Sequence, residues 1–231
     1  MRCWICGGEG NTGEHLIKAS DLKSHFKEIS EIHPVYYHTS VKKNVEIKSL
    51  KSSKLKSDAL ICGRCNSNLS QPYDKAWERM SSYLRNNWGN ALKKKVVPLK
   101  DVFPKNIDDS MLDVQLFFVK LFGCRIIEHE IPIDTKSFSN SFLKRSAHKN
   151  IFISIGQIRS RENIKVAGMT PIQAINFNNV PVFASWIYIV DELAVHIIYD
   201  TNRLNKKLLR QCWTPKNHGH KLHILEFKHS N

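Results

Sequence analysis

The chain has 231 residues, enough for one domain of ordinary size and a smaller one, and its 42% hydrophobic content excludes a chain that is disordered by composition. Lysine and arginine number 35 against 21 aspartates and glutamates, so the formal net charge is +14. A charge of this sign favours polyanionic partners, nucleic acid first and anionic membrane second, and it does not bear on the fold.

The first ten residues, MRCWICGGEG, lack the apolar core of a secretory signal. The most apolar segment, residues 111–127, is interrupted by Asp113, Gln115 and Lys120, so no stretch approaches the roughly 18 apolar residues of a membrane helix. We therefore expect a cytoplasmic protein with no membrane contact, in which thiols stay reduced. Cysteines in such a chain are more often metal ligands or core residues than disulfides.

Two Cys-x-x-Cys pairs, Cys3 with Cys6 and Cys62 with Cys65, predict one structural zinc site. The two-residue spacing lets both thiolates of a pair turn toward one metal, and two pairs complete a tetrahedral site with no open position for catalysis. A redox pair or four unrelated core thiols are the alternatives. The two remaining cysteines stand alone in apolar or aromatic surroundings and are expected to be buried thiols: Cys124 and Cys212.

Residues 42–56, KKNVEIKSLKSSKLK, hold six lysines against one glutamate. This composition predicts an exposed basic loop or hairpin, and a solvated face with no partner is the plainer interpretation. If the insert contacts nucleic acid, the candidate binding residues are its lysines, Lys42, Lys43, Lys48, Lys51, Lys54 and Lys56.

Helical spacing begins after Pro72, where apolar residues recur at three- and four-residue steps as far as Ala91. A second helix, residues 109–122, is apolar nearly all round and is expected to be buried. From residue 150 the pattern changes to β-branched and aromatic runs, which predict strands. These strands are expected at residues 150–158, 181–190, 193–200 and 221–227, with a hairpin turn at Asp191–Glu192, and together the elements predict an α+β fold.

Between and beside the cysteine pairs, the segments CWIC, GEHLI and CGRCNSNLSQPYD occur in that order. At these residues the sequence resembles the HNH nucleases, the ββα-metal group, in their zinc-knuckle form. The family pattern is Cys-x-x-Cys, an acidic residue followed by His on a strand, then Cys-x-x-Cys-Asn or Cys-x-x-Cys-His opening a helix. The resemblance implies a small zinc-stabilised ββα-metal domain over residues 1–75, followed by a mixed α+β domain of unknown role over residues 76–231.

Phosphodiester hydrolysis needs an activated water and charge neutralisation on the phosphate. A neutral imidazole can deprotonate water, and a hard cation such as Mg²⁺ takes oxygen ligands. The resemblance implies that His15 is the general base, Glu14 the acidic ligand of a catalytic Mg²⁺ or Mn²⁺, and Asn66 its final ligand. Since successive strand side chains point to opposite faces, Glu14 and His15 can share a site only if the strand is bent or the metal lies at its edge.

The sequence departs from the family pattern in two places. The asparagine that the family carries four or five residues before the second Cys-x-x-Cys is replaced here by Ser57 or Asp58. In the family this position orients the histidine through its backbone carbonyl, which any residue can supply. The proline common after the histidine is absent. Asn68 and Asp74 are reserve candidates for the metal shell, and a turn residue and a helix N-terminal acid are the plainer interpretations of the two.

Histidines also gather in NHGHKLH, at His218, His220 and His223, and His129 stands between two glutamates. Histidine-rich ends are usually solvated, and no carboxylate stands at ligand spacing, so we do not expect a metal there.

These features lead us to expect a metal-dependent endonuclease that hydrolyses DNA, in the role of a restriction or phage-defence effector. A non-catalytic zinc-knuckle module that binds DNA or RNA, and an RNase, are the alternatives, and DNA is favoured by the family resemblance alone. A second copy of the chain and a partner defence protein are the protein partners left open.

Overall fold

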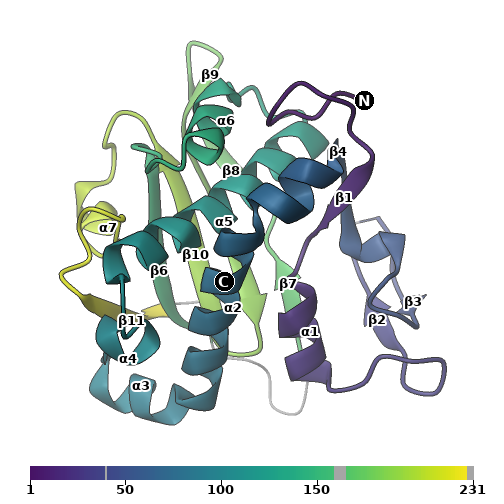
Figure 1. Cartoon of the computed structure of the whole chain (residues 1–231), viewed down its shortest axis with the longest axis horizontal. Helices are drawn as coiled ribbons and strands as arrows, with labels where there is room; N and C mark the ends of the chain where they lie inside the picture. The colour runs from purple at the N-terminus through teal and green to yellow at the C-terminus, as the bar shows by residue number, and fades with distance from the viewer. Residues whose placement is uncertain (40, 159–164, 228–231) are drawn as a thin grey trace.

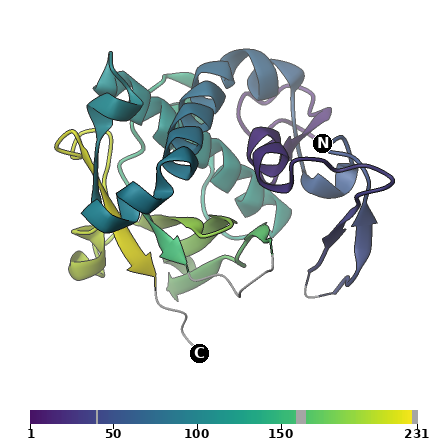
Figure 2. The same ribbon diagram turned by 90° about the horizontal axis from the view of Figure 1, so that it is seen from below.

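The computed structural model of the chain describes residues 1–39, 41–158 and 165–227. The fold is built around one mixed β-sheet, and the helices α2 (Gln71–Asn86) and α5 (Ile107–Glu128) lie on one of its faces (Figures 1 and 2). This arrangement confirms the predicted α+β class.

Within the described residues the main sheet has seven strands, in the order β5-β11-β6-β10-β9-β7, and β8 pairs with β9 beside β7. The strands β6, β9 and β10 are antiparallel neighbours, whereas β11 runs parallel to β6. Their bounds are β5 (Val96–Pro98), β6 (Ile151–Ile158), β7 (Ala167–Met169), β8 (Gln173–Phe177), β9 (Val180–Val190), β10 (Leu193–Asp200) and β11 (Lys221–Phe227). The four strands predicted from the sequence are therefore confirmed.

The hairpin predicted between β9 and β10 turns at Asp191, whose φ of 57° is left-handed, and Leu193 pairs with Val190. An aspartate tolerates this conformation better than a β-branched residue does. Long inward-facing side chains then cover the sheet from both strands, including Trp186, Tyr188 and Ile197, all nearly fully buried.

The helix α5 is the centre of the core, and it is longer at both ends than the predicted helix of residues 109–122. It packs against α2, where the indole of Trp77 stacks on Phe117 and meets Phe118 edge to face. Lys120, on this buried helix, has a side chain with no exposed surface. Since a buried lysine needs a charged or hydrogen-bonding partner, this residue must be paired within the fold.

The predicted helical stretch through Ala91 is in fact two helices, because α2 ends at Asn86 and α3 (Trp88–Lys94) begins two residues later. Asn87, at the break, has φ −119° and ψ 17°, and its side-chain amide donates to the carbonyl oxygen of Tyr83 at 2.9 Å. A side chain that bonds a carbonyl of the preceding turn competes with the helical hydrogen bonds, so the chain leaves the helix here.

The first sixty residues carry small elements beside the main sheet. The strands β1 (Thr12–His15) and β4 (Lys56–Ile61) form an antiparallel pair, and β4 leads through the π-helical turn η2 (Arg64–Leu69) directly into α2. The other short elements are α1 (Ala19–Phe26), β2 (Val35–Tyr37), β3 (Val45–Ile47), η1 (Ser53–Leu55), α4 (Leu99–Val102), α6 (Lys136–Leu143) and α7 (Lys206–Leu209).

A buried carboxylate joins the N-terminal elements to the sheet. Asp21 of α1 accepts hydrogen bonds from Trp77 Nε1 at 2.9 Å, Ser81 Oγ at 2.8 Å and the Tyr188 hydroxyl at 2.7 Å, and it pairs with Arg85. One hydrophobic core also contains residues from the N-terminal segment, from α5 and from the main sheet. The predicted boundary at residue 75 falls inside α2, so residues 1–75 and the remaining residues share a packed interior.

Candidate functional site

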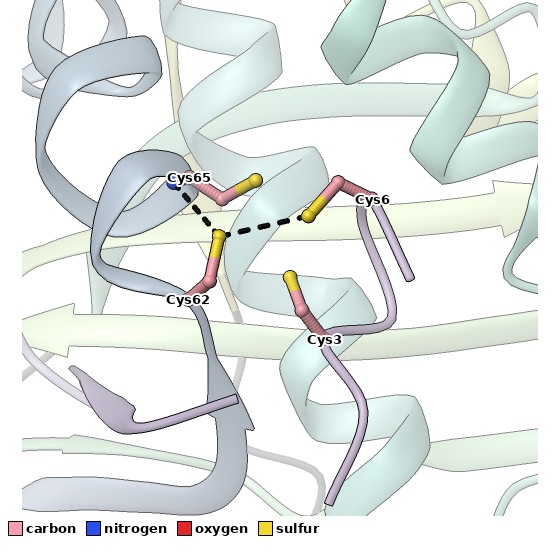
Figure 3. A group of neighbouring side chains, drawn as sticks. All are labelled: Cys3, Cys6, Cys62 and Cys65. Carbon is pink, nitrogen blue, oxygen red and sulfur yellow. Dashed lines mark hydrogen bonds between the residues drawn. The ribbon is translucent and has the colours of Figure 1, made fainter. Parts of the chain in front are cut away.

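The two cysteine pairs meet at one point, as the spacing predicts (Figure 3). Their four sulfur atoms all lie within 4.8 Å of one another, and the Sγ atoms of Cys6 and Cys62 are 3.6 Å apart. A tetrahedral zinc with Zn–S bonds of about 2.3 Å separates its sulfurs by about 3.8 Å. All four cysteines are free thiols. The cluster of Cys3, Cys6, Cys62 and Cys65 can therefore hold one metal ion such as zinc.

Tight backbone turns place both pairs. Gly7 donates to the carbonyl oxygen of Cys3 at 2.8 Å, and its φ of 77° is a left-handed conformation that glycine adopts without strain. In the second pair, the backbone N–H of Cys65 points at Cys62 Sγ over 3.4 Å. These turns direct the two sulfurs of each pair toward the same point, so both sulfurs of a pair can bind one metal ion.

The N–H group of Cys65 also affects the ionisation of a thiol. The backbone N–H of Cys65 and the neighbouring thiols lower the pKa of Cys62 to about 7, whereas burial raises the pKa of the Cys65 thiol. The Cys62 thiol therefore ionises more readily than the Cys65 thiol. A divalent cation would favour the thiolate form of the other three sulfurs, so metal binding here releases protons.

The first pair is anchored to helices outside residues 1–75. The indole of Trp4 lies so close to Gly123 of α5 that a Cβ there would come within 2.3 Å of the ring. Trp4 Nε1 also donates to Cys124 Sγ at 3.5 Å, and Ser139 of α6 donates to the carbonyl oxygen of Ile5. Burial raises the pKa of Cys124 to about 12, which confirms it as a buried thiol.

Cys212 differs from its prediction, because it is half-buried rather than buried, although its pKa is raised to about 11 by the burial that it has. It lies in the turn after α7, where its thiol donates to the carbonyl oxygen of Leu208 at 3.4 Å.

The strand pair β1–β4 and the helix that follows it give the order strand, strand, helix around the cysteine cluster. Thr12 pairs with Ile61 and His15 pairs with Lys56, and the register shifts between Gly13 and His15. A bent strand is one of the two arrangements in which Glu14 and His15 could share a site, the other being a metal at the strand's edge, and β1 is irregular at this point. The irregularity does not by itself turn the two side chains toward each other.

His15 is half-buried, and its ring Nε2 lies 3.1 Å from the carbonyl oxygen of Leu50. Because a carbonyl only accepts, this bond requires the proton on Nε2 and leaves the lone pair on Nδ1. The ring is therefore held in the tautomer that can take a proton at Nδ1. The carbonyl comes from Leu50 and not from Ser57 or Asp58, where the family pattern places it.

Asn66, in the turn η2, lies against β1. Its side-chain nitrogen donates to Thr12 Oγ1 at 3.1 Å and to the carbonyl oxygen of Gly13 at 3.5 Å. Both bonds use the amide nitrogen, so neither of them occupies the side-chain oxygen that a cation would take.

Glu14 turns to the interior. Its side chain is 7% exposed, and its Oε2 lies 2.9 Å from the Nζ of Lys120 on α5. The same Nζ lies 3.1 Å from Asp74 Oδ1, and Lys18 bridges Asp74 and Glu78 at 3.4 Å each. Burial lowers the pKa of Lys120, but Glu14 and Asp74 outweigh it and the pKa is raised, so the lysine stays charged.

The structure therefore brings the candidate residues together only in part. Asn66 contacts the strand that carries Glu14 and His15, but within the described residues no hydrogen bond or ion pair joins the three side chains to one another. Of the reserve candidates, Asp74 belongs to the Lys120 network, while Asn68 is exposed and accepts from Ser67 Oγ at 3.2 Å.

Sequence reasoning missed the role of Lys120. A signal was present, because a lysine inside the apolar run MLDVQLFFVKLFGCRII needs a buried acid as its partner. Which acid it would meet could not be read from that run, since Glu14 lies more than a hundred positions earlier in the chain.

The lysine-rich insert contributes β3 of the β2–β3 hairpin, the turn η1 and the first residue of β4, and the hairpin projects from the body of the molecule (Figure 2). Lys48 is paired with Glu31 at 3.0 Å and Glu46 at 3.7 Å, so its charge is offset. The half-buried Lys56 stands on β4, and the other four lysines are exposed: Lys42, Lys43, Lys51 and Lys54.

The histidines near the C-terminal end have an acidic partner that the sequence did not indicate. Asp108 Oδ1 lies 3.1 Å from His218 Nε2 and 3.4 Å from His220 Nε2, and these three residues form a second group that could hold a metal. His218 Nδ1, however, accepts the backbone N–H of His220 at 3.1 Å. This bond places the His218 proton on Nε2, which suits a donor to Asp108 rather than a metal ligand.

No protein-family model, no curated protein and no solved structure matches the chain. Of the helices in the described part of the chain, none combines the length and the apolar character needed to span a bilayer.

Proposed function

We propose that the chain is a metal-dependent nuclease of the ββα-metal kind, acting on DNA in a cytoplasmic restriction or phage-defence role. The observation that carries the proposal is the local arrangement around β1. A strand pair runs directly into a helix, four clustered cysteines tie the two together, and a histidine in a fixed tautomer stands at the end of the first strand.

In this proposal the cysteine cluster holds a structural zinc, whose four thiolates leave no open position. His15 is the general base, with Nδ1 as the atom that takes the proton from water. The carbonyl of Leu50 orients the ring, because it accepts the hydrogen bond from the proton on Nε2 and so leaves Nδ1 free. Exposed lysines of the insert hold the phosphates that flank the scissile bond.

Glu14 and Asn66 carry oxygen donors of the type that Mg²⁺ and Mn²⁺ prefer. The cation would neutralise charge on the phosphate and make the attacking water more acidic. The two carboxylate oxygens of Glu14 would have different partners, since Oε2 is bound to Lys120 and Oε1 is left for a cation. A cation held this way would have few ligands from the protein and would keep most of its waters.

A second function is favoured by the Glu14–Lys120 pair. Because the pair gives Glu14 a structural task, the same residues suit a zinc-knuckle module that binds nucleic acid without cutting it. An RNase uses the same groups and differs only in its substrate.

The test is a plasmid-nicking assay with Mg²⁺ or Mn²⁺, run in parallel on single-stranded RNA. The His15→Ala variant should abolish cleavage while leaving zinc content and nucleic-acid affinity nearly unchanged, since a half-buried polar side chain seldom contributes more than about 1 kcal/mol to stability. His33→Ala is the matched control, because its side chain is 64% exposed and it lies in the segment between β1 and β4, outside the proposed site. If His15→Ala cuts as fast as His33→Ala, the nuclease assignment is wrong and the binding module stands.

A further inference from the structure

Two adjoining surface hollows are lined by residues from α7, from the start of β6 and from the segments next to them. In Figure 1, α7 lies on the opposite side of the molecule from the N-terminal segment that carries Cys3 and Cys6. The volumes of the two hollows are about 360 and 350 Å³, and they share Phe152, Arg203 and Asn217 as a common wall. We call the two together the basic groove. None of Glu14, His15 and Asn66 lines it, so it is separate from the site of the proposed cleavage.

The groove is lined by five cationic side chains and by no aspartate or glutamate: Lys149, Arg203, Lys206, Arg210 and Lys216. All five are exposed, and none of them forms an ion pair with the residues that the structure describes. Unpaired cations that face one hollow repel one another, and a bound anion removes that repulsion. The charge of the groove is therefore complementary to a ligand that carries more than one negative charge.

The groove also has a flat surface, the guanidinium of the exposed Arg203, which rests on the buried ring of Phe152. The guanidinium of Arg203 lies over the ring of Phe152, 4.2 Å from its centroid, and Arg203 Nη2 donates to the carbonyl oxygen of Lys149 at 3.4 Å. This contact and this bond fix the guanidinium plane, so its remaining N–H groups are oriented in advance for a phosphate. A planar base can stack on the same surface.

A neutral polar group completes the lining. His148 is 3% exposed, its Nε2 lies 3.0 Å from Ser137 Oγ, and its Nδ1 is buried with no partner among the described residues. Burial, and to a smaller degree the charge of Lys149, lower the pKa of His148 to about 4, so the ring is neutral at pH 7. A buried polar atom without a partner is uncommon in folded proteins and marks a place where a ligand or a water belongs.

We propose that the basic groove binds nucleotide phosphates, with a base or sugar against the guanidinium of Arg203. Each cavity is within the size range of small-ligand sites, and two that share a wall suit consecutive nucleotides of a strand better than one free nucleotide. This binding does not depend on the proposed cleavage, because no residue is common to the two sites.

The test measures the affinity of the full chain for a fluorescein-labelled single-stranded DNA 12-mer by anisotropy, without added Mg²⁺, and for AMP by calorimetry. The double variant Arg203→Gln/Lys216→Gln should weaken 12-mer binding about tenfold and reduce the slope of log affinity against log salt by about 1.4, which is about 0.7 for each lost phosphate contact on a single strand. Lys100→Gln/Lys136→Gln removes two exposed charges outside the groove and should stay within about twofold of wild type.

Loss of 12-mer binding in the groove variant supports a strand as the ligand. Loss of AMP binding with 12-mer binding unchanged supports a free nucleotide at the same phosphate site. If neither ligand distinguishes the groove variant from wild type, the proposal is overturned, whatever the nicking assay shows. Lys216 is exposed and its side chain forms no hydrogen bond or ion pair with the residues that the structure describes, so Lys216→Gln alone should weaken binding without affecting the fold, which circular dichroism checks.

Discussion

The ion pair between Glu14 and Lys120 allows the sharpest test of how the N-terminal segment is held to the core. Glu14 belongs to β1 and Lys120 to the central helix α5, and their side chains are 7% and 0% exposed. Changing Glu14 to Gln keeps the size of the side chain and removes its charge. Lys120 is then left in the interior with Asp74 as its remaining acid, 3.1 Å away.

The size of the effect follows from burial. Removing one partner of a buried ion pair costs about 3–5 kcal/mol, because the other charge is left without compensation. Asp74 continues to pair with Lys120, and its side chain is 15% exposed, so part of that charge stays neutralised. We therefore expect Glu14→Gln to lower the free energy of unfolding by about 2–3 kcal/mol. For a chain of this length that corresponds to a fall in Tm of about 4–12 °C.

The assay is thermal and urea unfolding followed by circular dichroism, with zinc present and Mg²⁺ absent. The control is Glu78→Gln, which removes a carboxylate that is 40% exposed and lies 3.4 Å from Lys18, so a cost under about 1 kcal/mol is expected. The double variant Glu14→Gln/Lys120→Met should be less destabilised than the sum of its single changes, because the two charges compensate each other. Equal stability of Glu14→Gln and Glu78→Gln would refute the reasoning.

Two further predictions concern the zinc site and the insert. Cys62→Ser should lose the bound zinc and unfold at least residues 1–75, whereas the control Cys212→Ser should keep one zinc per chain. Metal analysis measures the zinc content and circular dichroism measures the fold. A Cys62→Ser protein that keeps its zinc contradicts the assignment. Changing Lys51, Lys54 and Lys56 to Ala should weaken binding of all DNA duplexes alike and flatten the salt slope by up to about 2–3 units, at about 0.9 for each phosphate contact. An unchanged slope would indicate that the insert is a solvated loop.

The elements that the sequence predicted well are those whose signal is local. The strand at residues 193–200 and the helix at residues 109–122 are predominantly apolar, so their burial is evident without knowledge of their neighbours. The meeting of the two cysteine pairs was predictable for another reason. Four thiols at this spacing have one common use, and that use requires them to come together.

What could not be predicted depends on partners that are distant in the sequence. The carbonyl that contacts His15 belongs to Leu50, because the insert folds back onto β1. Asp108 meets His218 across more than a hundred residues, so its spacing in the chain gave no sign of a contact. The break at Asn87 was a local event, but a helical pattern on both sides of it concealed the competition between a side chain and the backbone.

Glu14 and Lys120 also allow two roles of Glu14, structural partner and cation ligand, to be separated. Glu14→Gln and Lys120→Met break the same contact, but only Glu14→Gln alters a proposed ligand of the cation. Glu14→Gln and Lys120→Met each remove the buried ion pair, so both should lose stability. At a temperature well below both melting points, where both proteins are folded, a purely structural Glu14 predicts that they keep the same nucleic-acid affinity and the same cleavage rate. If Glu14 holds Mg²⁺, Glu14→Gln should lose cleavage and Lys120→Met should keep it. Lys120→Met should also need a lower Mg²⁺ concentration, because Glu14 Oε2 is released from the lysine. Equal cleavage by the two variants would exclude Glu14 as a ligand and leave His15 without a cation partner on its own strand.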